Sequence, residues 1–179
     1  MEQFKDVNRR KSKHKEKLNI AMFGQKRIPS RESGVEIVVE ELCSRMVAQG
    51  HNVTCYDRGG HHVSGSEYDS KRLKEYKGIR LKTVPTIEKK GLAAVSSSFF
   101  AALCCAFGRY DIVHIHAIGP ALLVPIARLL GIKVVFTHHG PDYDRDKWGF
   151  FAKTMLKLGE RMGTIFANEV IVISEVIND

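Results

Sequence analysis

The chain has 179 residues, of which 44% are hydrophobic and 27% are charged, and its formal net charge at pH 7 is +8. This length allows one α/β domain with a sizeable core, or one lobe of a larger protein. The balance of apolar and charged residues is that of a folded globular protein, which excludes a disordered or fibrous chain.

A strongly basic extension, residues 1–17, precedes the expected domain at residues 18–179. The stretch MEQFKDVNRRKSKHKEK holds seven Lys/Arg and three Asp/Glu and has no apolar periodicity, so we expect it to be mobile. Two interpretations stay open: a solvated tail, or a segment attracted to an anionic membrane surface or polyanion. The extension lacks the apolar run of a secretory signal, so we expect a cytoplasmic protein. If residues 1–17 are attracted to an anionic membrane, the protein would contact the inner face of that membrane peripherally.

Strand-like and helix-like segments alternate after this extension. Short apolar or alternating runs predict strands, and apolar residues at helical spacing, as in Val35, Val39, Leu42 and Met46, predict helices. In chain order the sequence predicts a strand at 18–24, a helix at 34–50, a strand at 51–57, a mobile loop at 58–77, a strand at 78–85, a helix at 92–107, a strand at 111–117, a helix at 119–131, a strand at 132–138, a helix at 150–167 and a strand at 168–174. Strands that alternate with single helices imply a Rossmann-like, mainly parallel sheet with helices on both faces.

One of these helices has to be weighed as a membrane span, because residues 92–108 contain no charge. The stretch is at the lower limit of spanning length, contains three consecutive serines, and is followed at once by Arg109 and Asp111. We therefore expect a crossover helix buried against the sheet.

The cysteines give no sign of a metal or redox motif. Cys43, Cys55, Cys104 and Cys105 fall within expected helices and strands and make no C-x-x-C pair. We expect buried thiols in a reducing cytoplasm.

Ligands of such sheets bind beyond the carboxyl ends of the strands, so a site is expected in the loops 25–33, 58–77, 117–119 and 140–149 and at Ser174. The first of these loops, GQKRIPSRESG, holds Lys26, Arg27 and Arg31 and leads into a helix at Gly34. Helix-end N–H groups and nearby cations suit a phosphate, and the alternative is an ordinary solvated loop. Neither a G-x-G-x-x-G turn nor a P-loop is present.

Four histidines end two neighbouring strands. His114 and His116 are two apart and share a face of their strand, whereas alternation places His138 and His139 on opposite faces. A metal site is one interpretation of H-x-H, but no acidic pattern completes a hydrolase-like set. We interpret His114 as a hydrogen-bonded core residue, and His116 and His139 as ligand contacts.

The motifs LNIAMFGQKRIPSRESGVEIVVEELCSRMVAQGHNVTCYDR, YDIVHIHAIGP, VVFTHHGPDYDRDKWG and NEVIVISE, in this order, resemble the N-terminal domain of family-4 glycosyltransferases of the GT-B fold. The similarity covers about 18–179 and is strongest to bacterial rhamnosyl- or glucosyltransferase-like enzymes of polysaccharide assembly. It implies a retaining enzyme that moves a sugar from a nucleotide-sugar to a saccharide or lipid-linked acceptor.

The resemblance also implies site residues. The loop after the first strand approaches the donor phosphates and sugar, which places Ser33 and Gly34 there together with Arg27, although many relatives have glycine where this chain has Ser33. The histidine that ends the fifth strand contacts the transferred sugar, and His139 takes this catalytic position, followed by Gly140. The acceptor side is expected to hold His116, Asp142, Tyr143 and Trp148.

The resemblance further implies a missing partner. In this family a C-terminal domain binds most of the nucleotide, and nothing in this sequence matches it, so we expect the chain alone to lack turnover. We expect no metal or other cofactor and no contact with nucleic acid. Peripheral contact with a membrane is compatible with the resemblance. Two alternatives stay open: a non-catalytic stand-alone lobe, and a metal-dependent hydrolase built on the four histidines.

Overall fold

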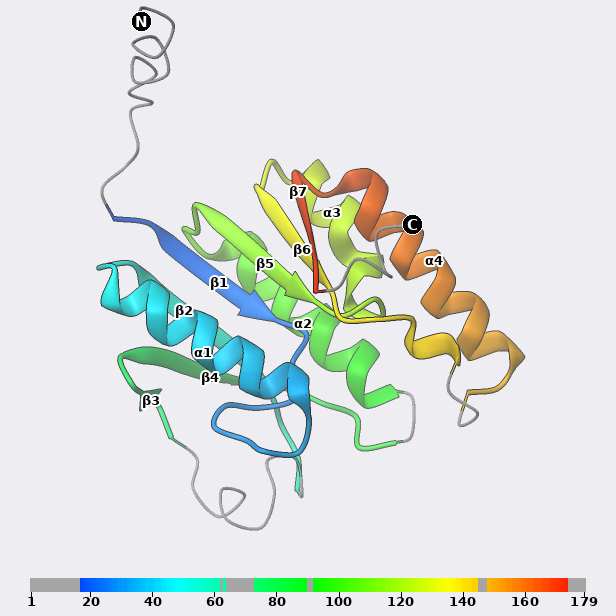
Figure 1. Ribbon diagram of the computed structural model, residues 1–179, viewed down its shortest axis with the longest axis horizontal. Helices are drawn as coiled ribbons and strands as arrows, with labels where there is room; N and C mark the ends of the chain where they lie inside the picture. Colours follow the sequence, from blue (N-terminus) through cyan, green and yellow to red (C-terminus); the bar gives the residue numbers. More distant parts are fainter. Residues whose placement is uncertain (1–16, 62, 64–72, 90–91, 145–147, 174–179) are drawn as a thin grey trace, which may run out of the picture.

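The computed structural model describes residues 17–61, 63, 73–89, 92–144 and 148–173. Within these residues the chain folds around a seven-stranded sheet with strand order β3-β4-β2-β1-β5-β6-β7 (Figure 1). The strands are β1 (Asn19–Phe23), β2 (Asn52–Arg58), β3 (Glu75–Tyr76), β4 (Ile79–Val84), β5 (Ile112–His116), β6 (Val134–His138) and β7 (Glu169–Val172). The helices are α1 (Gly34–Ala48), α2 (Leu92–Phe107), α3 (Val124–Leu129) and α4 (Phe150–Phe166), with short 3-10 segments η1 (Pro120–Leu123) and η2 (Asp142–Asp144).

The sheet is parallel except at one edge. The pairs β1–β2, β1–β5, β2–β4, β5–β6 and β6–β7 are parallel, and the two-residue strand β3 runs antiparallel to β4. After β1 the chain builds the sheet outward through β2 and β4, and it then returns to the other side of β1 for β5, β6 and β7. The order therefore reverses between β1 and β5, which makes the carboxyl ends of these two strands the topological switch point.

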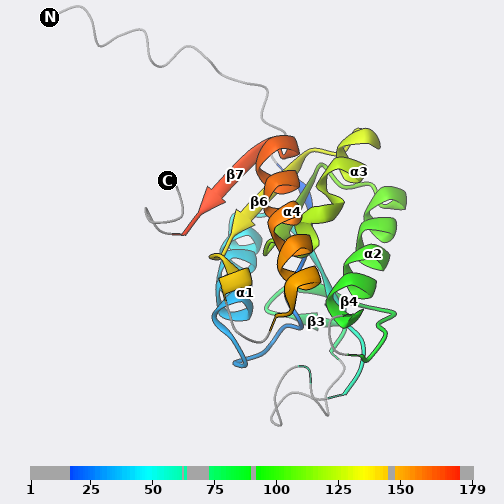
Figure 2. The same cartoon turned by 90° about the vertical axis from the view of Figure 1, so that its right-hand side faces the viewer.

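Helices cover both faces of the sheet, as the alternation of strands and helices predicts. On one face α1 packs Val39 and Cys43 against β1, β2 and β4. On the other face, residues of α2, η1 and α3 pack against the central strands, with α4 beside them. Figure 2 shows α1 on one side of the strands and α2 and α3 on the other. Burial of apolar surface in these two layers is the main stabilising term of such a fold.

The prediction of a mainly parallel α/β sheet is confirmed, with local differences. Strand β3 was not predicted, because two residues in a polar stretch give no periodicity. The helix expected at 119–131 is divided into η1 and α3, and Pro125, which has no backbone N–H, lies in the first turn of α3. The 3-10 turn η2 was also not predicted.

Two smaller expectations have different outcomes. Helix α2 covers the residues expected for it, and no helix among the described residues is long and apolar enough to cross a membrane. Three of the cysteines are buried, but Cys104 is exposed, so the expectation of four buried thiols is wrong. Adjacent helix positions differ by about 100°, so Cys104 and Cys105 cannot both face the sheet.

Some predictions concern residues outside the described ranges. They are the mobility of residues 1–16, residues 62 and 64–72 of the loop at 58–77, the segment 145–147 of the loop at 140–149, and the site position Ser174.

Candidate functional site

The loop after β1 lies directly against the end of β5, at the topological switch point. Gly24 has φ of +115°, and a Cβ atom placed on it would lie 2.0 Å from the backbone oxygen of His116. Only glycine combines this left-handed conformation with so close an approach. The loop that leads to α1 and the end of the histidine-bearing strand therefore form one continuous surface.

Glu36 anchors this loop from the first turn of α1. Its buried carboxylate accepts the backbone N–H of Lys26 at 2.9 Å and the hydroxyl of Ser33. Ser33 is the N-cap residue of α1 in an extended conformation and makes no side-chain bond to the helix end. Because the first N–H groups of a helix have no partner within the helix, the start of α1 is a suitable place for an anion.

Two cations of the loop, Arg27 and Arg31, have structural partners. Arg27 is 6% exposed, and its guanidinium donates to the carbonyl oxygens of Arg58 at 3.0 Å and Gly60 at 2.9 Å. Arg31 pairs with Glu40 at 2.7 Å, and Lys77 pairs with the same carboxylate at 2.8 Å. Arg27 thus joins the loop after β1 to the end of β2, and its contact with a donor phosphate stays a prediction.

A buried carboxyl supports the same loop from β2. Asp57 is 3% exposed and accepts a hydrogen bond from the side-chain amide of Gln25 at 3.2 Å. Burial raises the pKa of Asp57 to about 7, although hydrogen bonds from Gln25 and Ile28 and the charge of Arg27 oppose this shift. The loop is therefore held by two acidic side chains, one on α1 and one on β2.

Three histidines form a continuous row beside the loop. His114 and His116 stack on one face of β5 with ring centroids 4.2 Å apart. His114 Nε2 bonds Thr137 Oγ1 at 2.7 Å, and His116 Nδ1 lies 3.1 Å from His139 Nε2. The expectations that His114 is a hydrogen-bonded core residue and that it shares a face with His116 are confirmed.

The row is graded from buried to accessible. His116 is fully buried, while His139 is partly exposed at the end of β6. His116 therefore lies beneath His139, and its Nδ1 holds the His139 ring through Nε2. Direct contact of His116 with an acceptor stays a prediction.

All three rings favour the neutral form at neutral pH. Burial lowers the pKa of His114 to about 4 and that of His116 well below its ordinary value. Burial and the charge of His138 lower the pKa of His139, while Glu36 and Asp142 act in the opposite direction. A neutral His139 can donate or accept a hydrogen bond at an uncharged ligand group.

His138 faces the opposite side of the sheet from His139, as strand alternation predicts. Its Nε2 bonds Glu160 Oε1 of α4 at 2.5 Å, and its Nδ1 accepts the backbone N–H of Gly140 at 3.0 Å. Gly140 has φ of +116°, and a Cβ atom placed on it would have no neighbour within 4 Å, so open space lies in front of it. Glu160 and His138 together fix the turn that presents His139.

The acceptor-side residues lie after this turn. Asp142 and Tyr143 belong to η2, and the Tyr143 hydroxyl lies 3.5 Å from Glu160 Oε1 with Lys157 over its ring at 5.2 Å. Trp148 is half-buried just before α4. The backbone N–H of Asp142 donates to the carbonyl oxygen of Gly140 at 2.9 Å, which keeps η2 beside the turn after His139, whereas Tyr143 is engaged with α4.

Sequence reasoning did not identify Glu36, Glu160 or Asp57 as parts of the site. For Glu36 a signal existed, because Ser33 and Glu36 have the S-x-x-E spacing of a capping box. Glu160 and Asp57 become recognisable only through the tertiary contacts with His138 and Gln25. No group of three His, Cys, Asp or Glu side chains among the described residues is arranged to hold a metal ion.

Comparisons with known proteins agree with this geometry. The sequence model described as Glycosyltransferase Family 4 matches residues 33–179, and no curated protein sequence matches the chain. Sucrose-phosphate synthase from Thermosynechococcus elongatus is similar in structure, with a TM-score of 0.69 and 16% identity over 90% of this chain and 43% of that one.

Two further structures are similar at lower scores. Anabaena HepE, in complex with UDP and glucose, has a TM-score of 0.54 and 13% identity over 86% of this chain and 37% of its own. Arabidopsis thaliana UGT89C1, complexed with UDP, has a TM-score of 0.52 and 14% identity over 88% of this chain and 42% of its own. The chain spans less than half the length of each of these structures, and likeness at such identities shows the fold.

Proposed function

Because this chain belongs to Glycosyltransferase Family 4 and has the fold of an N-terminal GT-B lobe, we propose that it is the acceptor-side lobe of a retaining glycosyltransferase. The reaction moves a sugar from a nucleotide-sugar to a saccharide or lipid-linked acceptor in bacterial polysaccharide assembly. The observation that carries the proposal is the continuous surface at the switch point, where Gly24 of the loop into α1 lies against His116 and His116 bonds His139. HepE and UGT89C1, with the same fold, are solved with UDP.

The start of α1 serves the leaving group. Departure of a nucleoside diphosphate places negative charge on its phosphate oxygens, and preorganised N–H groups stabilise such charge. Gly34 has no heavy atom within 4 Å of a Cβ position, so a phosphate can approach the backbone there. Glu36 holds the loop in place through the N–H of Lys26 and the hydroxyl of Ser33.

His139 serves the transferred sugar. The ring is held at Nε2 by His116, and its lowered pKa keeps it neutral at physiological pH. A neutral imidazole orients a sugar hydroxyl without placing positive charge beside a sugar ring that becomes positive in the transition state. Asp142 and Trp148 contact the acceptor. The carboxylate of Asp142 accepts hydrogen bonds from its hydroxyls, and the indole of Trp148 stacks on a sugar ring.

The remaining half of the cleft comes from a C-terminal domain that binds most of the nucleotide. The chain covers 37–43% of the length of the three similar structures, in keeping with a single lobe. In this proposal the isolated lobe binds ligands weakly and has no efficient turnover.

An NMR titration tests the proposal. The ¹H–¹⁵N spectrum of the ¹⁵N-labelled chain is followed during addition of UDP-glucose, dTDP-rhamnose and short oligosaccharides. We expect shifts at the amides of Gly34, the first residue of α1, of His139, the residue after β6, and of Trp148, two residues before α4. Amides just before the amino end of β6, such as those of Gly131 and Lys133, should stay unchanged.

Two variants make the experiment specific. His139→Ala should abolish the shifts at Gly34 and Trp148, whereas His51→Ala, which removes an imidazole from the opposite edge, should leave them intact. The absence of shifts with every sugar ligand, accompanied by zinc-dependent shifts at His114 and His116, would contradict the proposal and favour the metal-dependent alternative.

A further inference from the structure

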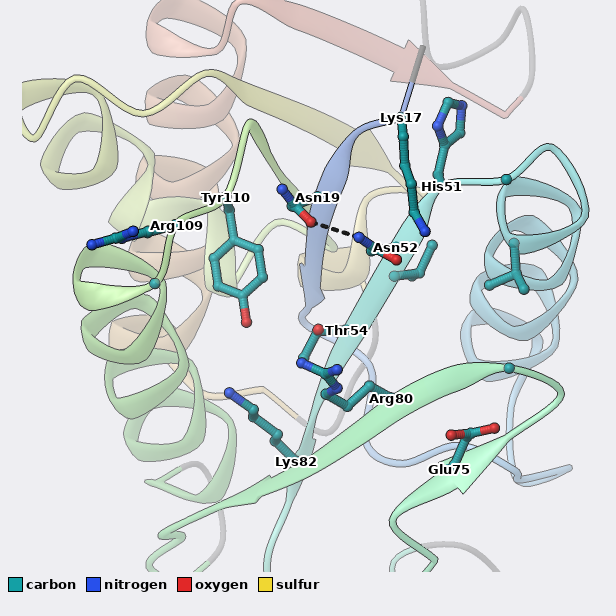
Figure 3. Close-up of a pocket in the computed structure, with 15 residues that line it drawn as sticks. Lys17, Asn19, His51, Asn52, Thr54, Glu75, Arg80, Lys82, Arg109 and Tyr110 are labelled. Atoms are coloured by element: carbon teal, nitrogen blue, oxygen red, sulfur yellow. Dashed lines mark hydrogen bonds between the residues drawn. The ribbon is translucent and has the colours of Figure 1, made fainter. Parts of the chain in front are cut away.

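A polar hollow of about 600 Å³ lies at the amino ends of β1, β2 and β4, on the opposite edge of the sheet from the proposed sugar site. Figure 3 shows its lining, which comes from the segment before β1, from strands β2 and β4, and from the turn before β5. A volume of this size falls within the range of small-molecule sites, about 300–1,000 Å³. Most such sites are apolar, and this one is not.

The hollow exists because polar residues occupy a sheet face that is usually covered. Asn52, Thr54 and Tyr56 alternate along β2, and only Tyr56 belongs to the apolar core on that face. Arg80 and Lys82 continue the polar surface on β4, and Asn19 continues it on β1. A parallel sheet normally buries both faces under helices, so a polar floor on strands this central calls for a polar occupant.

The charge of the hollow is strongly positive. Among the described residues that line it, four are basic, namely Lys17, Arg80, Lys82 and Arg109, and one, Glu75, carries a carboxylate. Although Glu75 is the cross-strand neighbour of Arg80, no ion pair joins them, and within the described part of the chain none of the four cations pairs with a carboxylate. The ammonium of Lys82 lies over the Tyr56 ring, 5.6 Å from its centroid, which leaves its charge available to a ligand.

Lys17, Arg80 and Lys82 extend over the floor from two separate elements, whereas the side chain of Arg109 points away from them (Figure 3). In Figure 3 the ammonium of Lys17 lies beside Asn52, and Arg80 and Lys82 extend toward Thr54 and Tyr110, while Arg109 stands on the outer wall. The amide of Asn52 donates to Asn19 Oδ1 at 2.8 Å, and the amide of Asn19 donates to the carboxylate of Asp111 at 3.3 Å, which fixes both amides of the floor. Guanidinium, ammonium and amide donors in one concave surface match the oxygens of phosphate groups.

We propose that this hollow binds an anion that carries two or more phosphate groups. One end holds Lys17 and the other holds Arg80 and Lys82, so a ligand with two separated negative centres fits better than a single phosphate. Such groups come either from a soluble molecule with several phosphates or from neighbouring lipid headgroups of an anionic membrane, each of which supplies one phosphate. The proposal does not depend on the sugar site, because no residue is shared between the two.

The test compares two pairs of substitutions with the same change of net charge. Arg80→Gln with Lys82→Gln removes two cations from the hollow, and Lys133→Gln with Arg161→Gln removes two exposed cations elsewhere. Sodium pyrophosphate is titrated by calorimetry in one arm. In the other arm the proteins are sedimented with vesicles of phosphatidylcholine, with and without phosphatidylglycerol.

A specific site weakens in the hollow variant alone. We expect its affinity for pyrophosphate to fall by at least about tenfold, since each lost charge-assisted hydrogen bond corresponds to roughly that factor, while the control pair changes less than about twofold. Selective loss of sedimentation with anionic vesicles, without pyrophosphate binding, identifies the headgroup as the source. Equal weakening of both pairs in both arms, or no binding by the unsubstituted protein, would overturn the proposal. Lys17→Gln provides a third substitution if the double variant does not fold.

Discussion

At the scale of single residues, Asp57 links the support of the candidate site to pH. Its carboxyl is buried beside the loop after β1, and burial raises its pKa from an ordinary value of 3.8 to about 7. The folded protein therefore binds more protons than the unfolded chain between these two values. The stabilisation by protonated Asp57 is complete below pH 3.8 and is lost as the pH rises toward and through 7.

Asp57→Asn should remove this dependence. The variant keeps an acceptor for the amide of Gln25 and cannot ionise. The difference in free energy of unfolding between the variant and the unsubstituted protein should therefore be near zero at pH 4. At pH 8 the variant should be more stable by about 3 kcal/mol. Chemical denaturation across this range measures the difference, in which the contributions of the buried histidines cancel. The exposed carboxyl Asp144, changed to Asn, is the control and should give a flat profile. A flat profile for Asp57→Asn would show that burial does not raise the pKa of Asp57.

The residue scale also marks where prediction from sequence works. The alternation of His138 and His139 between two faces, and the shared face of His114 and His116, follow from the two-residue period of a strand. The partners of these side chains do not follow from it. Glu160 meets His138 across 22 residues of chain, and His116 meets His139 across 23. Contacts at such separations depend on strand order, which the period of a sequence does not contain.

At the scale of elements, α4 shows how the position of a whole helix affects the site. The residues of α4 that are buried are Gly159 and Gly163. A Cβ on Gly159 would lie 2.1 Å from the backbone oxygen of Ile118, and one on Gly163 would lie 2.7 Å from the ring of Phe136. The helix backbone therefore approaches the loop after β5 and strand β6 closely, and this approach brings Glu160 to His138.

Gly159→Ala should displace the helix. Alanine favours a helix by about 1 kcal/mol over glycine, but overlap with a backbone atom opposes this gain and should leave a net loss of roughly 2–3 kcal/mol. Denaturant unfolding measures the loss, and the amide shift of His139 reports the displacement through Glu160. Gly149→Ala, at the exposed N-cap where nothing lies within 4 Å, should cost no more than about 1 kcal/mol, the usual loss for alanine at an N-cap. Equal effects of the two substitutions would show that α4 does not pack through Gly159.

Elements with a strong period were predicted to within two residues or so, as for α2 and α4. Elements whose signal is short or mixed were not. Strand β3 has only two residues, and the proline at 125 divides a continuous apolar pattern into η1 and α3. The reversal of strand order between β1 and β5 had no signal in the sequence, although it decides where the site lies.

At the scale of the whole molecule, the two proposed sites occupy opposite edges of one sheet. Strands of five residues separate these edges by about 16 Å. Gly24 and His139 lie at the carboxyl ends of the strands, and Asn19 and Asn52 lie at the amino ends. The central strands β1 and β5 run between the two sites. How rigid each site is therefore depends on the stability of these central strands relative to the outer strands of the sheet.

Amide hydrogen exchange should show this gradient across the sheet. β1 and β5 are paired on both sides and largely buried, whereas among the described residues β7 pairs with β6 alone and all its side chains are exposed. Amides of β1 and β5 should exchange only through global unfolding, and those of β7 through local opening, with protection lower by at least about 100-fold. The measurement is exchange followed by NMR in the intact chain. If β7 amides were as protected as those of β1, the predicted gradient would be wrong. Pairing of β7 with a second copy of the chain is one way in which an edge strand gains such protection. In that case the protection would fall as the protein concentration is lowered.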